Sequence, residues 1–160
     1  MDPSVATQLI VLFVLLLLSA FFSSAETSLT TVNKLRIRSL VEEGNKRAKV
    51  ISNLIENPSK MISAILIGNN IVNIALASIG TVLFVKYYGD MGATLSTIVV
   101  TITVLIFGEI TPKSVAKNNP EAFAMFSAPI LRIFIWVFAI LNWIFTGWTK
   151  LITKLFKLEN

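Results

Sequence analysis

The sequence of 160 residues contains no cysteine and no histidine. Their absence excludes a disulfide framework, a Cys/His zinc or iron site, and histidine acid–base chemistry. Charge is also scarce, at 14% of residues, where a soluble domain has about a quarter. The basic residues stand between apolar stretches and form no separate arm. We therefore expect a chain that lies in a lipid bilayer and has no nucleic-acid partner.

Three stretches carry no charge, and each approaches or exceeds the roughly 20 residues that a spanning helix needs. The uncharged stretches are 3–25, 61–85 and 91–108. No basic residue precedes Lys34, so we interpret the first stretch as a span and not as a secretory signal peptide. The prediction is an all-α integral membrane domain with three transmembrane helices, at about residues 4–30, 60–86 and 91–112.

The segment between the first two spans differs in kind, because seven basic and three acidic residues lie between Lys34 and Lys60. Its apolar residues follow two helical faces, separated at Gly44-Asn45. We predict a helical hairpin over about residues 33–58, outside the membrane core. The positive-inside rule places this hairpin in the cytoplasm and the N-terminus outside.

A fourth apolar segment, residues 122–148, allows two interpretations. If it crossed the membrane, Lys150, Lys154 and Lys157 would lie outside, against the positive-inside rule. Arg132 interrupts it, and aromatic residues are spread along it, as in a helix at the membrane interface. We favour an amphipathic juxtamembrane helix over about residues 120–157 on the cytoplasmic side, with a fourth span as the alternative.

Polar residues inside the spans are costly in a bilayer unless they are paired or functional. In the first span, Ser19, Ser23 and Glu26 are three or four residues apart and so share one helical face. The second span places three asparagines within five residues, at Asn69, Asn70 and Asn73. The simpler explanation for any one of these residues is interhelical packing or hydrogen bonding. Glu26 could likewise pair with Lys34 or Lys113 at the membrane interface.

The third span ends in Phe-Gly-Glu-Ile-Thr-Pro-Lys, residues 107–113. Pro112 has no amide hydrogen and clashes with the carbonyl of residue 108, so we predict that the helix opens near Gly108 and Glu109. Freed carbonyls, a carboxylate, hydroxyls and amide oxygens are hard ligands that suit Mg²⁺, Ca²⁺ or Na⁺. The sequence thus favours a cation site between the spans.

Three motifs together resemble the transmembrane domain of the CorC/cyclin M (CNNM) family. The resemblance implies a magnesium transporter, an exporter exchanging Mg²⁺ for Na⁺, that works as a homodimer in the cell membrane. Paired cytoplasmic CBS modules and a CorC-type domain are expected after such a domain and are absent from these 160 residues. Ser24 stands where a glycine is common in the family. The motifs are Ser19-Ala-Phe-Phe-Ser-Ser-Ala-Glu-Thr-Ser-Leu, Ile67-Gly-Asn-Asn-Ile-Val-Asn73 and Phe107-Gly-Glu-Ile-Thr-Pro-Lys113.

Carried over by motif, the resemblance implies a ligand set for Mg²⁺ made of side chains from all three spans and one backbone carbonyl. The implied ligands are Ser19, Ser23, Asn70, the Gly108 carbonyl and Glu109; Glu26, Asn69 and Asn73 are secondary candidates for support or for Na⁺.

Two further readings of the same residues stay open. One is a regulatory or scaffolding membrane module whose polar residues only hold a dimer together. The other is an intramembrane hydrolase in which Lys113 activates Ser19 or Ser23. Nothing else in the spans supplies a catalytic base, so we expect no enzyme.

Overall fold

The structure is a computed structural model that describes residues 3–156. Helices account for nearly all of this part of the chain, and no strand occurs within it. The all-α membrane fold predicted from the sequence is confirmed. The helices are α1 (Pro3–Thr31), α2 (Lys34–Glu42), α3 (Lys46–Glu56), α4 (Pro58–Tyr88), η1 (Gly89–Met91), α5 (Gly92–Thr103), η2 (Val104–Ile110), α6 (Thr111–Asn118), α7 (Pro120–Val137) and α8 (Ala139–Leu155).

The predicted hairpin is formed by α2 and α3, and its ends are set by local side-chain chemistry. The Asn33 side chain accepts hydrogen bonds from the first free amides of α2, and Asn45 does the same for α3 through the Ala48 amide at 3.1 Å. Between the helices, Gly44 has a φ of 89°, a left-handed conformation that glycine adopts without steric cost. Hairpin and caps therefore follow from the sequence directly.

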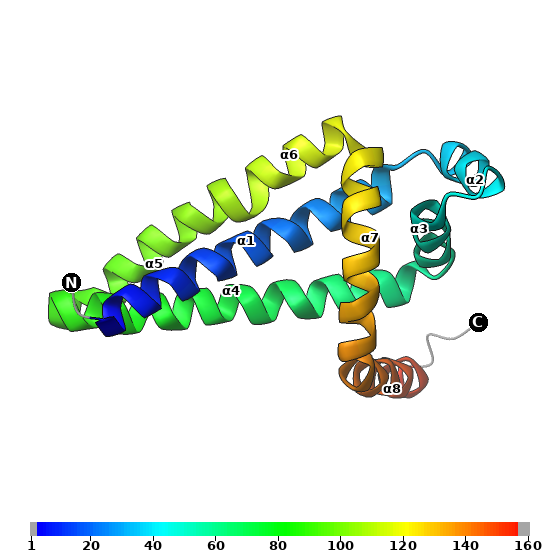
Figure 1. Ribbon diagram of the computed structural model, residues 1–160. Helices are drawn as coiled ribbons and strands as arrows, with labels where there is room; N and C mark the ends of the chain where they lie inside the picture. Colours follow the sequence, from blue (N-terminus) through cyan, green and yellow to red (C-terminus); the bar gives the residue numbers. More distant parts are fainter. Residues whose placement is uncertain (1–2, 157–160) are drawn as a thin grey trace.

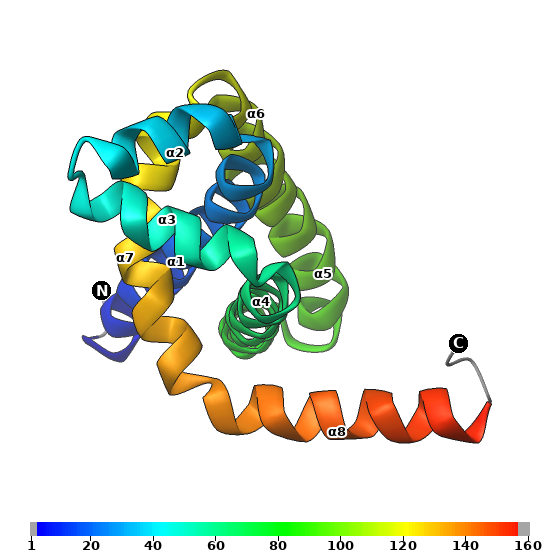
Figure 2. The ribbon, with the colours of Figure 1, turned by 90° about the vertical axis from the view of Figure 1, so that its right-hand side faces the viewer.

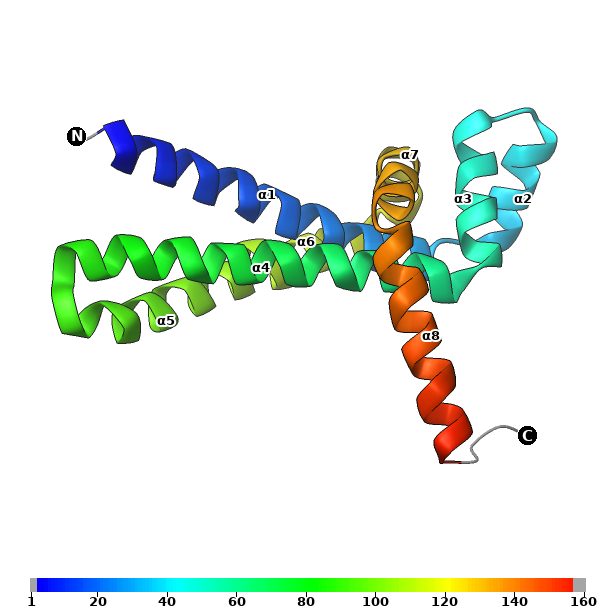
Figure 3. The same cartoon turned by 90° about the horizontal axis from the view of Figure 1, so that it is seen from below.

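Three helical segments lie side by side and run the length of the molecule: α1, α4, and the continuous run α5–η2–α6 (Figure 1). The helical chain from Pro58 to Asn118 reverses direction at Gly89–Met91, so it supplies two antiparallel spans (Figure 3). In the most apolar window of Pro3–Thr31, and likewise in that of Pro58–Asn118, only 17% of the residues are buried by the rest of the chain. The long apolar faces left exposed match a lipid environment and confirm three spans.

The fourth apolar segment forms two helices that lie crosswise to the spans, near the hairpin end of the bundle (Figures 1 and 2). Pro120–Val137 is long and apolar enough to cross a membrane by length and composition. Its axis nevertheless lies across α1 and α4, as expected for a juxtamembrane helix. The predicted single helix over 120–157 is divided at Phe138, and residue 157 lies outside the described residues.

The core lies where α7 packs against α1 and α4. Phe22 of α1 is 1% exposed, and its ring meets Phe134 of α7 edge to face with 5.1 Å between centroids. On the other side, the ring covers Gly68 of α4, where a Cβ atom would come within 2.4 Å of Phe22 Cζ. A glycine at this position thus allows α4 to approach the aromatic cluster that anchors α7. This packing fixes α1 against α4 at the depth of the polar residues.

Candidate ion site

The polar faces of α1 and α4 meet inside the bundle. Ser19, fully buried, donates a hydrogen bond to Asn73 Oδ1 at 2.7 Å. Because the two helices are antiparallel, one turn forward on α1 corresponds to one turn back on α4, which sets Ser23 opposite Asn69. Ser23 Oγ and Asn69 Oδ1 are both buried and have no hydrogen-bond partner. Buried polar atoms are nearly always satisfied, so two orphaned oxygens at matching depth indicate a place for a ligand.

The third span contributes a π-helix, η2, over Val104–Ile110. The sequence predicts an opened turn near Gly108 and Glu109; the structure has there a helix widened by one residue per turn, with the Thr111 amide donating to the Ile106 carbonyl five residues back. Pro112 follows at once and cannot donate to the Gly108 carbonyl. The chain stays helical because the wider turn accommodates the proline without a break. Single π-turns of this kind are frequent at functional sites.

Gly108 is the point at which this wide turn touches α1. A Cβ atom on Gly108 would lie 2.7 Å from Ser19 Oγ and 3.3 Å from Ser19 Cβ. The absence of a side chain lets the backbone of η2 reach the polar face of α1. The Gly108 peptide unit therefore lies beside the buried hydroxyl of Ser19.

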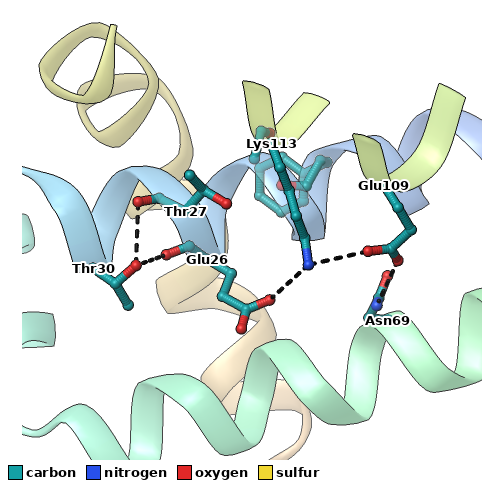
Figure 4. Close-up of polar contacts among 8 residues, drawn as sticks. Glu26, Thr27, Thr30, Asn69, Glu109 and Lys113 are labelled. Atoms are coloured by element: carbon teal, nitrogen blue, oxygen red, sulfur yellow. Dashed lines mark hydrogen bonds and ion pairs between the residues drawn. The ribbon is translucent and has the colours of Figure 1, made fainter. Parts of the chain in front are cut away.

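Glu109 is the carboxylate of the site, and its side chain is 22% exposed. Its Oε1 accepts a hydrogen bond from Asn69 Nδ2 at 3.2 Å. Its Oε2 lies 3.1 Å from Lys113 Nζ. The same ammonium lies 3.9 Å from Glu26 Oε2 on α1, and Figure 4 shows it between the two carboxylates. All three spans thus share one network of charge and hydrogen bonds.

The side-chain oxygens of the site are two hydroxyls, two amide oxygens and one carboxylate, and the Gly108 peptide unit lies beside Ser19. Such a set suits a hard cation, and magnesium in particular takes six oxygens in an octahedron. No group of three or more His, Cys, Asp or Glu side chains that could hold a metal occurs in the described part of the chain. A cation here would accordingly depend on neutral oxygens with Glu109 as the main charge.

The sequence pattern that describes the cyclin M transmembrane N-terminal domain matches residues 10–160. The chain belongs to this family. The three motifs quoted above and the three-span architecture agree with that assignment.

Relatives of this cyclin M domain include several bacterial proteins. The UPF0053 protein of Haemophilus influenzae is 41% identical over 96% of the chain, and the UPF0053 inner membrane protein YfjD of Escherichia coli is 35% identical over 89%. The polyamine export protein of Escherichia coli is 31% identical over 94%. The chain spans about a third of the length of these relatives, 37%, 33% and 37% respectively.

Within this cyclin M domain, the structure does not bring Asn70 into the site. Asn70 is exposed and lines a groove between α4 and α8 with Ser63 and Thr149. One residue along a helix turns the side chain by about 100°, so Asn69 and Asn70 cannot face the same neighbour. The two asparagines that face the site are Asn69 and Asn73, which the sequence offers only as secondary candidates.

For Lys113 of this cyclin M domain, the sequence predicts only a pair with Glu26 at the membrane interface, and the structure adds the contact with Glu109. Its spacing of four residues from Glu109 on a helix was the available signal, because such pairs lie on one face. Of the residues in the implied ligand set, Ser19 lies beside Gly108, Glu109 is joined to α4 through Asn69, and Ser23 Oγ is buried on the same face of α1 as Ser19. Glu26 lies at the edge of the site, with its carboxylate 3.9 Å from Lys113 Nζ.

Proposed function

We propose that this domain carries Mg²⁺ across the membrane, with the ion held between the three spans by oxygen ligands. The observation that supports this most is the pair of orphaned buried oxygens, Ser23 Oγ and Asn69 Oδ1, beside the carboxylate of Glu109. A cation would satisfy both oxygens at once. Ser19, Asn73 and the Gly108 carbonyl complete the shell in this proposal, and Asn69 replaces Asn70.

One carboxylate and neutral oxygens compensate a dication only partly. Weak compensation suits a transporter, which has to release its ion on the other side. We infer that export is coupled to Na⁺, because Na⁺ accepts the same hard oxygens and its gradient supplies the driving force. We also infer a homodimer, since a second copy would cover part of the exposed apolar surface of α1, α4 and α5.

The test is Mg²⁺ flux in proteoliposomes together with Mg²⁺-dependent thermal stabilisation, for the wild type and Glu109→Gln. We expect Glu109→Gln to abolish both, because it removes the charge and keeps the shape. Glu43→Gln is the matched control, since Glu43 is exposed at the end of α2. Unchanged flux in folded Glu109→Gln contradicts the proposal.

Ion selectivity is measured in the same assay by titrating Mg²⁺, Ca²⁺, Mn²⁺ and Na⁺. Rigid octahedral coordination at about 2.0–2.1 Å favours Mg²⁺ over the larger Ca²⁺. A larger stabilisation by Mg²⁺ than by Ca²⁺, lost in Glu109→Gln, supports a magnesium site. Equal stabilisation by all ions, retained in Glu109→Gln, supports instead a scaffolding module whose polar residues only join helices.

A second candidate is export of a polyamine. Lys113 places a primary ammonium between Glu109 and Glu26, so a group of this chemistry fits the site, and one relative is named a polyamine export protein. Spermidine is the discriminating probe. Stabilisation and transport of spermidine that Mg²⁺ does not inhibit favours this candidate over magnesium.

We expect no enzymatic activity. The hydrolase reading requires Lys113 to act as a base on Ser19 or Ser23. In the structure the Lys113 ammonium lies near two carboxylates, and the Ser19 hydroxyl donates a hydrogen bond to Asn73 Oδ1. Neither contact supports activation of a serine.

A further inference from the structure

The carboxylate that would bind the ion is already engaged at both oxygens. Glu109 Oε1 accepts a hydrogen bond from Asn69, and Oε2 forms an ion pair with Lys113 Nζ at 3.1 Å, a distance within the ordinary N–H···O range. Asn69 leaves its own oxygen free for an ion and need not move. The Lys113 ammonium is positively charged, and it pairs with the carboxylate oxygen that a bound cation would contact.

Lys113 has a second carboxylate within reach. Its ammonium is 3.9 Å from Glu26 Oε2, and the Lys113 and Glu26 side chains are 43% and 42% exposed. A lysine side chain carries its ammonium on a flexible stem of four carbons, so moving the charge costs little free energy. A shift toward Glu26 would uncover Glu109 without leaving the ammonium unpaired in a membrane, where an unpaired charge is expensive.

The charges in this group also favour competition. Two carboxylates share one ammonium, so the group carries a single net negative charge before an ion arrives. A dication then meets a positive charge a few ångströms from its main ligand. Like charges at such short range repel, and the partial burial of Glu109, whose side chain is 22% exposed, limits the screening by water.

We propose that Lys113 is a tethered cation that competes with the transported ion for Glu109 and moves to Glu26 when the ion binds. This inference rests on the proposed function of the same site. The tethered cation lowers affinity and speeds release, because the ammonium returns to Glu109 as the ion leaves. Lys113 is thus an affinity-determining residue and not a ligand.

The test is the Mg²⁺ dissociation constant and transport kinetics of Lys113→Met, with Lys113→Gln as a second neutral variant. Removing the positive charge is expected to tighten Mg²⁺ binding by at least about tenfold. The KM for flux falls with it, and kcat falls too, because release of the ion slows. A lysine that serves only packing would lower stability and leave KM and kcat in their wild-type ratio.

Two control variants separate charge from shape and from general electrostatics. Lys113→Arg keeps the positive charge and is expected to stay within about threefold of wild-type affinity. Lys117→Met removes an exposed charge one turn further along α6 and is expected to change affinity by less than about twofold.

The role of Glu26 is tested by a double-mutant cycle. Glu26→Gln removes the second position of the ammonium and is expected to weaken Mg²⁺ binding by about fivefold in the wild type. In the Lys113→Met background the same change is expected to have little effect. An equal effect in both backgrounds means that Glu26 acts on the ion directly, and overturns the shift.

Unchanged or weaker Mg²⁺ binding in folded Lys113→Met and Lys113→Gln overturns the tethered cation. If Glu109→Gln loses binding in that case, the magnesium site stands and only this inference fails. If Glu109→Gln keeps wild-type binding, the proposed function fails and this inference fails with it.

Discussion

Asn69 donates its side-chain amide to the Glu109 carboxylate over 3.2 Å and keeps its own carbonyl oxygen buried without a partner. One side chain on α4 therefore positions the charged group of η2 and offers a free oxygen beside it. Asn70, the next residue along, faces the groove toward α8. Substituting Asn69 and Asn70 one at a time therefore tests which face of α4 lines the site.

We predict that Asn69→Leu weakens Mg²⁺ binding by about 10- to 100-fold, the usual cost of losing a group that orients a ligand. Asn70→Leu is expected to change binding by less than about twofold, as at a surface position. Mg²⁺-dependent thermal shifts measure both. Loss of binding in Asn70→Leu with retention in Asn69→Leu would reverse the assignment and support the ligand set implied by family resemblance.

Gly108→Ala is expected to destabilise the fold by about 1–3 kcal/mol, because the added methyl group meets Ser19 Oγ at 2.7 Å. It also moves the wide turn away from α1 and so weakens Mg²⁺ binding. Gly147→Ala in α8 is the matched control, since nothing lies within 4 Å of a Cβ atom there. That variant is expected to gain about 0.5–1 kcal/mol from helix propensity. Equal melting temperatures for the two variants would contradict the close approach.

Pro112→Ala restores a backbone amide that can donate to the Gly108 carbonyl. We expect the apo protein to be stabilised by about 1 kcal/mol or more, because proline inside a helix costs about 3 kcal/mol. Mg²⁺ binding should weaken at the same time, since the carbonyl is then used within the helix. Pro129→Ala, inside α7, is the control: it should change stability and leave Mg²⁺ affinity as it is. Tighter Mg²⁺ binding in Pro112→Ala would argue against a ligand role for this carbonyl.

Orientation in the membrane is tested with single cysteines, because the natural chain has none. Asp90→Cys in η1 and Lys46→Cys in the hairpin both place an exposed thiol, at opposite ends of the bundle. The positive-inside rule predicts that a membrane-impermeant maleimide labels Asp90→Cys in intact cells and labels Lys46→Cys only after permeabilisation. The opposite labelling pattern would place the N-terminus in the cytoplasm.

Much of the fold was predictable because the residues near each helix end determine where that helix begins or ends. Asn33, Gly44 and Asn45 are capping and turn residues, and they delimit the hairpin where the sequence places them. The spans follow from the length of uncharged sequence. By contrast, no glycine or proline marks the division between α7 and α8 at Phe138, so the segment looks continuous in sequence.

The composition of the site was predictable, but its register was not. Helical periodicity places Asn73 on a shared face with Asn69 and equally on a shared face with Asn70, and it does not say which of these two faces meets α1. In a soluble helix the apolar face identifies the interior, but in a membrane both the lipid-facing and the packed sides are apolar. Only the packing of Phe22 on Gly68 fixes which asparagines face Ser19 and Ser23.

The π-helix has a consequence for everything that follows it in the chain. A wide turn is equivalent to one residue inserted into an α-helix, and one residue rotates the downstream helix by about 100°. The number of residues in Val104–Ile110 therefore sets the rotation of α6 about its axis, and this rotation directs Lys113 toward Glu26. Deleting a single residue before Gly108 would keep every ligand in the sequence and aim the ammonium elsewhere.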